Sequence, residues 1–150
     1  MIPMRVMLLL AVFAFASWAE FAPADDTQSL VTEADSLEPF LWTARPVVVF
    51  ADTPNDPRFI KQMELLEADQ AALLDRDVVV LVDTDPDARS DIRQQLRPRG
   101  FQLALIGKDG RVELRKPAPW SVREISRSID KMPLRRQEIR DRSAASAGSG

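Results

Sequence analysis

The chain contains no cysteine and no histidine among its 150 residues. Without cysteine it has no disulfide, no thiolate nucleophile and no thiolate metal ligand. Without histidine it lacks the side chain that most often acts as a general base or metal ligand near neutral pH. Only carboxylates, hydroxyls and the 20 Lys and Arg side chains remain for chemistry. The composition therefore favours a protein that is not an enzyme and holds no cofactor.

Long hydrophobic runs are also missing, apart from a short one near the N-terminus. Residues 7–16 are apolar, Arg5 precedes them, and the small residues Ser17 and Ala19 follow. This pattern is typical of a secretory signal peptide, residues 1–19, cleaved after Ala19. The run is shorter than the about 20 residues of a membrane span, and an uncleaved N-terminal anchor is the alternative. We expect a periplasmic or secreted protein, which touches a membrane only through an uncleaved signal.

The charge is unevenly distributed, although the net charge is only −3. Acidic residues dominate residues 20–87, and basic residues dominate residues 107–142. The C-terminal arginines alternate with Glu and Asp and have no aromatic residues between them, so we expect a solvated helix and no nucleic-acid partner.

The length suits one domain, which composition places at residues 36–142. Residues 20–35 are acidic and poor in large apolar side chains, so they predict a flexible leader. Residues 143–150 (SAASAGSG) predict a disordered tail. Residues 37–42 are apolar enough to pack on the domain as a short helix or arm.

The apolar run 47–51 predicts a strand buried on both faces, at the centre of a sheet, and the run 78–82 predicts a second, fully apolar strand. Between them, Asp56 and Pro57 form a helix start, and apolar positions at three- and four-residue steps predict one amphipathic helix to about residue 74.

The second half of the chain predicts two helices and a hairpin. Asp85–Pro86 repeats the cap-plus-proline start and opens a shorter helix. Asp109–Gly110 lies between apolar runs and indicates a β-hairpin with a type I′ turn. Ser121–Glu124 is a capping box that begins the closing helix, and Pro133 should interrupt that helix.

The element order is β-α-β-α-β-β-α. Strands separated by helices are expected to be parallel with right-handed crossovers, and the hairpin adds an antiparallel edge. This is an α/β, thioredoxin-like layout: a central mixed sheet of about four strands, two parallel and then a hairpin, flanked by helices.

Residues 99–112 (RGFQLALIGKDGRV) resemble the thioredoxin segment that carries the cis-proline, whose place Gln102 takes. Residues 47–58 are similar to the strand and turn that carry the redox CxxC, with Asn55 and Arg58 near the positions of the two sulfurs. The resemblance therefore implies the fold without its redox groups.

A second resemblance is more specific. Residues 105–110 and 114–115, followed by 129–135 and Glu138, resemble a family of bacterial secreted proteins of unknown function. Its relatives include a peroxiredoxin-like domain in vertebrate sushi-repeat extracellular proteins. This resemblance implies a fold and an extracytoplasmic location, and no activity.

The main candidate site is the loop after the first strand, because ligands of open α/β sheets bind beyond the carboxyl ends of the strands. Helix capping and turn formation are the structural alternative for the same residues. The candidate ligand- or partner-binding residues here are Asp52, Thr53, Asn55, Asp56, Arg58 and Gln102.

Two further candidates compete with this loop. Asp52, Asp83 and Asp85 follow strand ends and suggest a carboxylate- and metal-dependent hydrolase, although capping also explains the last of them. Arg135 and Arg136 suggest a partner-facing patch, or a solvated helix end. We favour a cysteine-free binding module for an unknown protein or small ligand of the envelope, with no catalytic residue and no resident metal.

Overall fold

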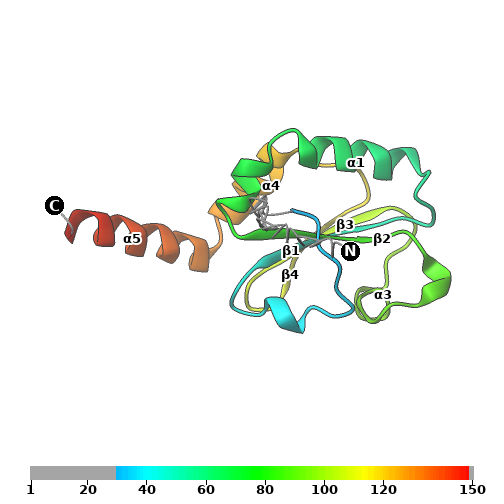
Figure 1. Cartoon of the computed structure of the whole chain (residues 1–150), viewed down its shortest axis with the longest axis horizontal. Helices are drawn as coiled ribbons and strands as arrows, with labels where there is room; N and C mark the ends of the chain where they lie inside the picture. The colour runs from blue at the N-terminus through cyan, green and yellow to red at the C-terminus, as the bar shows by residue number, and fades with distance from the viewer. Residues whose placement is uncertain (1–29, 149–150) are drawn as a thin grey trace, which may run out of the picture.

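The computed structural model describes residues 30–148. The predicted signal peptide and the first ten residues of the predicted leader lie outside this range. Within it, a four-stranded sheet lies between two layers of helices, and one long helix leaves the domain (Figure 1). None of the helices from residue 30 to residue 148 has the length and apolar character that crossing a membrane requires.

The first strand is the centre of the sheet, as predicted. β1 (Arg45–Phe50) is buried at every residue, because it lies between two other strands and under helices on both faces. β2 (Val78–Asp83) pairs with it in parallel, with Val47 opposite Val80. The strand order is β2-β1-β3-β4.

The direction of the third strand contradicts the prediction that strands separated by helices are parallel. β3 (Gln102–Ile106) is antiparallel to β1, although a helix precedes it. That helix, α3 (Asp91–Leu96), has six residues and a length of about 9 Å, whereas a six-residue strand spans about 20 Å. The connection is therefore too short to bring the chain back to the amino end of β1, and β3 starts at the carboxyl end of β1.

The predicted hairpin joins β3 to β4 (Val112–Lys116), but its turn is not type I′. The N–H of Gly110 donates to the carbonyl of Gly107 at 2.9 Å, so Lys108 and Asp109 are the central residues. A type I′ turn needs positive φ at both, and neither has it. Instead Gly110 takes φ +80°, which fits a type I turn followed by a left-handed glycine.

One face of the sheet is covered by α1 (Pro57–Glu67), α2 (Gln70–Leu74) and α4 (Val122–Asp130). The predicted single helix to residue 74 is wrong, because Asp69 accepts a hydrogen bond from the N–H of Ala72 and starts a second helix. The capping box at Ser121 is confirmed. The core of this face includes Val47, Val49, Leu66, Leu73, Leu103, Leu105, Ile125 and Ile129.

The opposite face carries η1 (Glu38–Phe40), η2 (Pro86–Ala88) and α3 (Figure 1). Asp85 caps only the single turn of η2, and Ser90 caps α3, so the predicted helix at Asp85–Pro86 is two separate elements. Ile92 and Leu96 of α3 and Phe40 of η1 belong to the apolar cluster on this face, whose sheet residues include Val48, Phe50, Leu81 and Ala104.

The second part of the predicted leader, residues 30–35, has a defined place. Leu30 is buried, its carbonyl accepts from the N–H of Val80 at 2.8 Å, and Thr32 donates to the carbonyl of Val80 at 3.0 Å. These bonds form an isolated parallel bridge on the outer edge of β2. The acidic composition of residues 20–35 did not predict this contact, because it depends on a single buried residue, Leu30, that holds the segment against β2.

The closing helix is interrupted before Pro133, as predicted, and a separate helix that the sequence did not predict, α5, runs from Pro133 to Gly148. Residues 143–148, which the sequence assigned to a disordered tail, are therefore helical, although exposed. Alanine is the best helix former, and the hydroxyls of Ser143 and Ser146 donate to carbonyls four residues earlier. Beyond its first turns this helix projects away from the domain (Figure 1).

Candidate functional site

The predicted loop after β1 is a preorganised helix start. Asp56 accepts a hydrogen bond from the N–H of Arg58 at 2.8 Å and forms an ion pair with the guanidinium of Arg58 at 3.0 Å. These side-chain and backbone hydrogen bonds from Arg58 hold the pKa of Asp56 below its usual value. Asp56 is thus engaged as a cap, whereas Asp52, Thr53 and Asn55 present exposed side chains.

The fold places Gln102, the residue in the position of the thioredoxin cis-proline, at the end of β1 from which this loop leaves. Gln102 lies opposite Phe50 at the carboxyl end of β1, and the guanidinium of Arg58 lies 5.6 Å from the ring centre of Phe101. The Nε2 of Gln102 is buried and forms no hydrogen bond with the described residues. A polar edge with one unused buried donor is suited to recognition rather than to acid–base catalysis.

At the end of the neighbouring strand, Asp83 is held by two side chains that sequence reasoning missed. Arg93 contacts it at 2.8 Å and the hydroxyl of Ser90 donates to it at 2.5 Å. Burial alone would raise the pKa of Asp83, but the bonds from Arg93 and Ser90 outweigh it and lower the pKa. Arg93 also donates to the carbonyl of Ala51 at 3.0 Å, which joins the ends of β1 and β2.

The three aspartates of the hydrolase alternative do not form a metal-binding group. Within residues 30–148, no cluster of three or more Asp, Glu, His or Cys side chains could hold a metal ion. Asp83 is bound to Arg93, and Asp85 accepts a hydrogen bond from the N–H of Asp87. Asp52 remains exposed.

The predicted patch of arginines on the last helix is divided by the fold. Arg136 is exposed, but Arg135 is only 3% exposed and binds Asp75 at 2.9 Å. Arg135 also lies 3.7 Å from Asp130 and 3.6 Å from Glu138. It therefore anchors α5 to the domain and does not face a partner.

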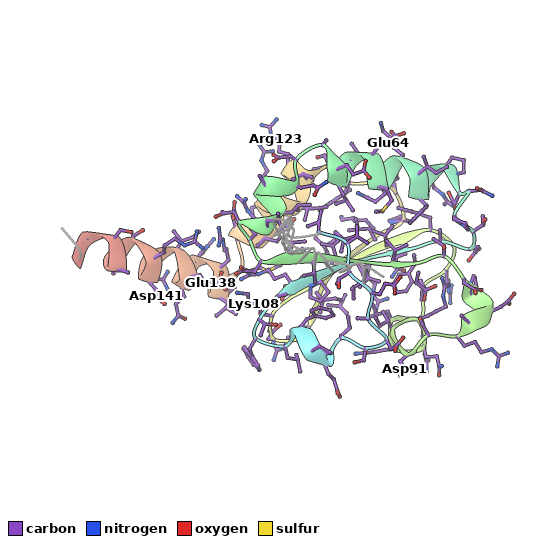
Figure 2. All side chains as sticks on the ribbon, in the orientation of Figure 1. Glu64, Asp91, Lys108, Arg123, Glu138 and Asp141 are labelled. Carbon is purple, nitrogen blue, oxygen red and sulfur yellow. The ribbon has the colours of Figure 1, made fainter. Side chains whose placement is uncertain are left out.

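The same junction contains a buried ion-pair network that the sequence did not reveal. Glu138 binds Arg45 at 3.0 Å and Lys108 at 2.8 Å, and Figure 2 shows Lys108 beside Glu138 where α5 leaves the domain. Burial would raise the pKa of Glu138, but the hydrogen bonds from Lys108 and Arg45 outweigh it and lower the pKa. The only sequence signal was a charged residue, Arg45, at the start of a buried strand.

Some of the cavities formed by residues 30–148 lie away from the loop after β1, and two of them border the end of β2 and the start of α5. The first, of about 350 Å³, opens at the carboxyl end of β2, between the leader and the segment from Asp83 to Ile92. The second, of about 210 Å³, lies beside Trp42 and the start of α5. Trp42 is 69% exposed and has φ 63°, a backbone conformation that bulky side chains rarely adopt.

Trp120, in contrast, belongs to the domain. Its ring is half-buried against the core, and the ammonium of Lys116 lies 4.4 Å from its centre. Gln62, which is fully buried, exchanges two hydrogen bonds of 2.8 Å with the backbone of Trp120.

Solved structures with a similar fold are thioredoxins and peroxiredoxins. The reduced 2-Cys peroxiredoxin of Plasmodium vivax aligns with a TM-score of 0.52 and 16% identity, over 63% of this chain and 80% of that one. Chloroplastic thioredoxin z aligns with a TM-score of 0.50 and 20% identity, over 67% and 90%. Identities this low concern the fold alone, and they confirm the predicted thioredoxin-like class.

Sequence comparison gives a partial relative and a family. Coiled-coil domain-containing protein 80 of Danio rerio is 48% identical over 52 residues, which are 33% of this chain and 6% of that protein. The chain thus corresponds to a small part of this relative. Residues 36–138 match the family described as Domain of unknown function (DUF4174). Because this match covers more than half of the sequence, the chain belongs to the DUF4174 family.

Proposed function

We propose that this protein is an exported thioredoxin-like domain that acts as a binding module without thiol chemistry. The observation that carries the proposal is a thioredoxin-like fold in a chain that contains no cysteine. Redox exchange by thioredoxins needs a thiolate, and this chain has none to offer. The edge where that chemistry takes place in the fold's relatives instead presents polar, uncommitted side chains.

The loop after β1 is suited to recognition because its base is fixed. Asp56 and Pro57 start α1, and the ion pair with Arg58 closes the turn. A preorganised loop loses little conformational entropy on binding, so its polar contacts contribute more to affinity. Asp52 and Asn55 are the exposed groups that we expect to touch the ligand or partner protein.

Export is the second part of the proposal, and residues 1–19 support it. Their order of Arg5, apolar run and small residues is that of a cleavable signal. The full chain, produced in a bacterium, should be recovered from the periplasm or medium with the mass of residues 20–150. Recovery of the uncleaved chain from the cytoplasm would contradict export and leave the binding proposal unaffected.

Site-specific cross-linking tests the binding part. A photoreactive amino acid at position 55 should form a discrete cross-linked product in cells that export the protein. The same group at position 64 is the control, because Glu64 lies on the outer side of α1 (Figure 2). Equal product patterns from the two positions would refute the assigned surface, and insulin reduction or peroxide turnover by the purified chain would refute the non-redox function.

A further inference from the structure

The cavity at the carboxyl end of β2 has an apolar floor and a wall from the leader. Val48, Leu81 and Ile92 form the floor of this space of about 350 Å³. Residues 32–35 form one wall, and residues 83–85 form the other. A cavity of this size is within the range of ligand sites in proteins.

The walls carry negative charge that the described part of the chain leaves uncompensated. Glu33, Asp35 and Asp85 are exposed, and between residues 30 and 148 no Lys or Arg forms an ion pair with them. Asp83, in the same wall, is different because Arg93 binds it. None of the described residues that line the cavity is basic. The cavity thus offers three carboxylates to a cationic occupant.

The backbone beside the cavity offers a second kind of contact. The N–H and C=O of Val80 face the outer edge of β2, where the N–H donates to the carbonyl of Leu30 and the C=O accepts from the N–H of Thr32. Peptide groups alternate in direction along a strand, so those of Val82 face the same edge. The leader forms its bridge only at Val31, and Ala34 already packs on the core of the α3 face. Val82 is 38% exposed, at an edge position open to an added strand.

We propose that this cavity binds an extended segment of a partner protein that carries lysine or arginine side chains. The inference rests on the proposed binding function and names the chemistry of the partner. The segment hydrogen-bonds to the edge of β2 at Val82, which is the usual way a peptide adds to a sheet. Its basic groups meet Glu33, Asp35 and Asp85, while their aliphatic stems cover the apolar floor.

The probe for this site is a fluorescein-labelled nonapeptide of alternating lysine and valine, titrated with the full protein and followed by fluorescence anisotropy. The test variant combines Glu33→Gln, Asp35→Asn and Asp85→Asn; asparagine keeps the capping of η2. A control variant removes equal charge elsewhere through Glu64→Gln, Glu67→Gln and Glu113→Gln.

Each exposed carboxylate contributes about a twofold effect on affinity, so the test variant should bind about tenfold more weakly. The control variant should stay within twofold of the original protein. The same peptide N-methylated at every second residue should also bind several-fold more weakly, because it cannot donate to the strand edge. Circular dichroism of both variants verifies that the fold is retained.

Three results would overturn the inference: equal losses in the two variants, equal binding of a glutamate–valine peptide, and unchanged binding of the N-methylated peptide. Sedimentation that shows a dimer broken by the test variant would identify a second copy of the chain as the occupant and would also overturn it. Cross-linking at position 55 in the original protein separates the two proposals. If that product forms while the peptide does not bind the original protein, the proposed function stands and this inference falls.

Discussion

Removal of the Glu138 carboxylate should destabilise the protein strongly, because two cations depend on it. Arg45, 1% exposed, loses the one carboxylate that pairs with it among residues 30–148 and keeps the carbonyl of Arg76 at 2.9 Å. Lys108 keeps Asp77 at 2.8 Å. Breaking a buried ion pair from one side costs about 3–5 kcal/mol. Since Glu138 is partly exposed and both cations retain one acceptor, we expect about 2–3 kcal/mol for Glu138→Ala.

Urea denaturation followed by tryptophan fluorescence measures this effect. With a slope of about 1–3 kcal/mol per molar urea, the midpoint should fall by roughly 1–2 M. Asp141→Ala is the matched control. It also replaces a carboxylate of α5 by alanine, but one turn further along, where the helix is exposed (Figure 2). Its midpoint should stay the same or rise slightly, since alanine favours helix.

The pH dependence gives an independent check on the cause. The pKa of Glu138 is lowered in the folded protein, so its contribution is complete above the unfolded value of about 4.3. It is lost as the pH falls through the lower folded value. The difference between the original protein and Glu138→Ala should therefore be full at pH 7 and shrink below about pH 4. Equal midpoints for Glu138→Ala and Asp141→Ala at pH 7 would refute the reasoning.

Three other predictions concern the turn, the strand ends and the exposed helix. Gly110→Ala should lower the free energy of unfolding by about 1–2 kcal/mol, because the φ of Gly110 is +80° and a Cβ there would lie 2.8 Å from the side chain of Leu41. Thermal unfolding measures this loss. Gly148→Ala is the control, because the space around Gly148 is open. Asp83→Asn should cost about 2 kcal/mol in urea by leaving Arg93 without a carboxylate, a loss that Asp52→Asn should not reproduce. Ala144→Gly should lower the far-ultraviolet helical signal without moving the unfolding midpoint, because that residue lies on the exposed part of α5. A midpoint that moves with the helical signal would show that this part of α5 supports the domain.

The sequence predicted elements whose causes are local. The apolar run 47–51 predicted a central strand, and Asp56 with Pro57 predicted the start of α1, because burial and capping depend on neighbouring residues. The capping box at Ser121 was correct for the same reason. The break at Asp69 was missed because the apolar stripe continues across it, so periodicity alone reads two helices as one.

Features that depend on distant residues were beyond prediction. Arg135 looks like a surface residue in an Arg-rich segment, and its burial depends on Asp75, 60 positions away. The direction of β3 depends on how far α3 carries the chain, which composition does not encode. At the candidate site, Gln102 became a candidate only through the resemblance to thioredoxins, because its place opposite Phe50 depends on the antiparallel direction of β3, which the order of elements did not predict. Sequence reasoning missed Arg93, whose partner Asp83 is ten residues away on another element.

Some carboxylates of the described chain are paired with cations from other elements, and others are not. Asp83 and Glu138 are held by cations from other elements, so their cost of burial is offset within the fold. The carboxylates of Glu33, Asp35 and Asp85 have no such partner among residues 30–148, although they surround a cavity with an apolar floor. Like charges gathered without a neighbouring cation repel one another, and a cationic partner would relieve that repulsion on binding. For this reason the open end of β2, rather than the arginines of α5, is where we expect specificity for a partner to arise.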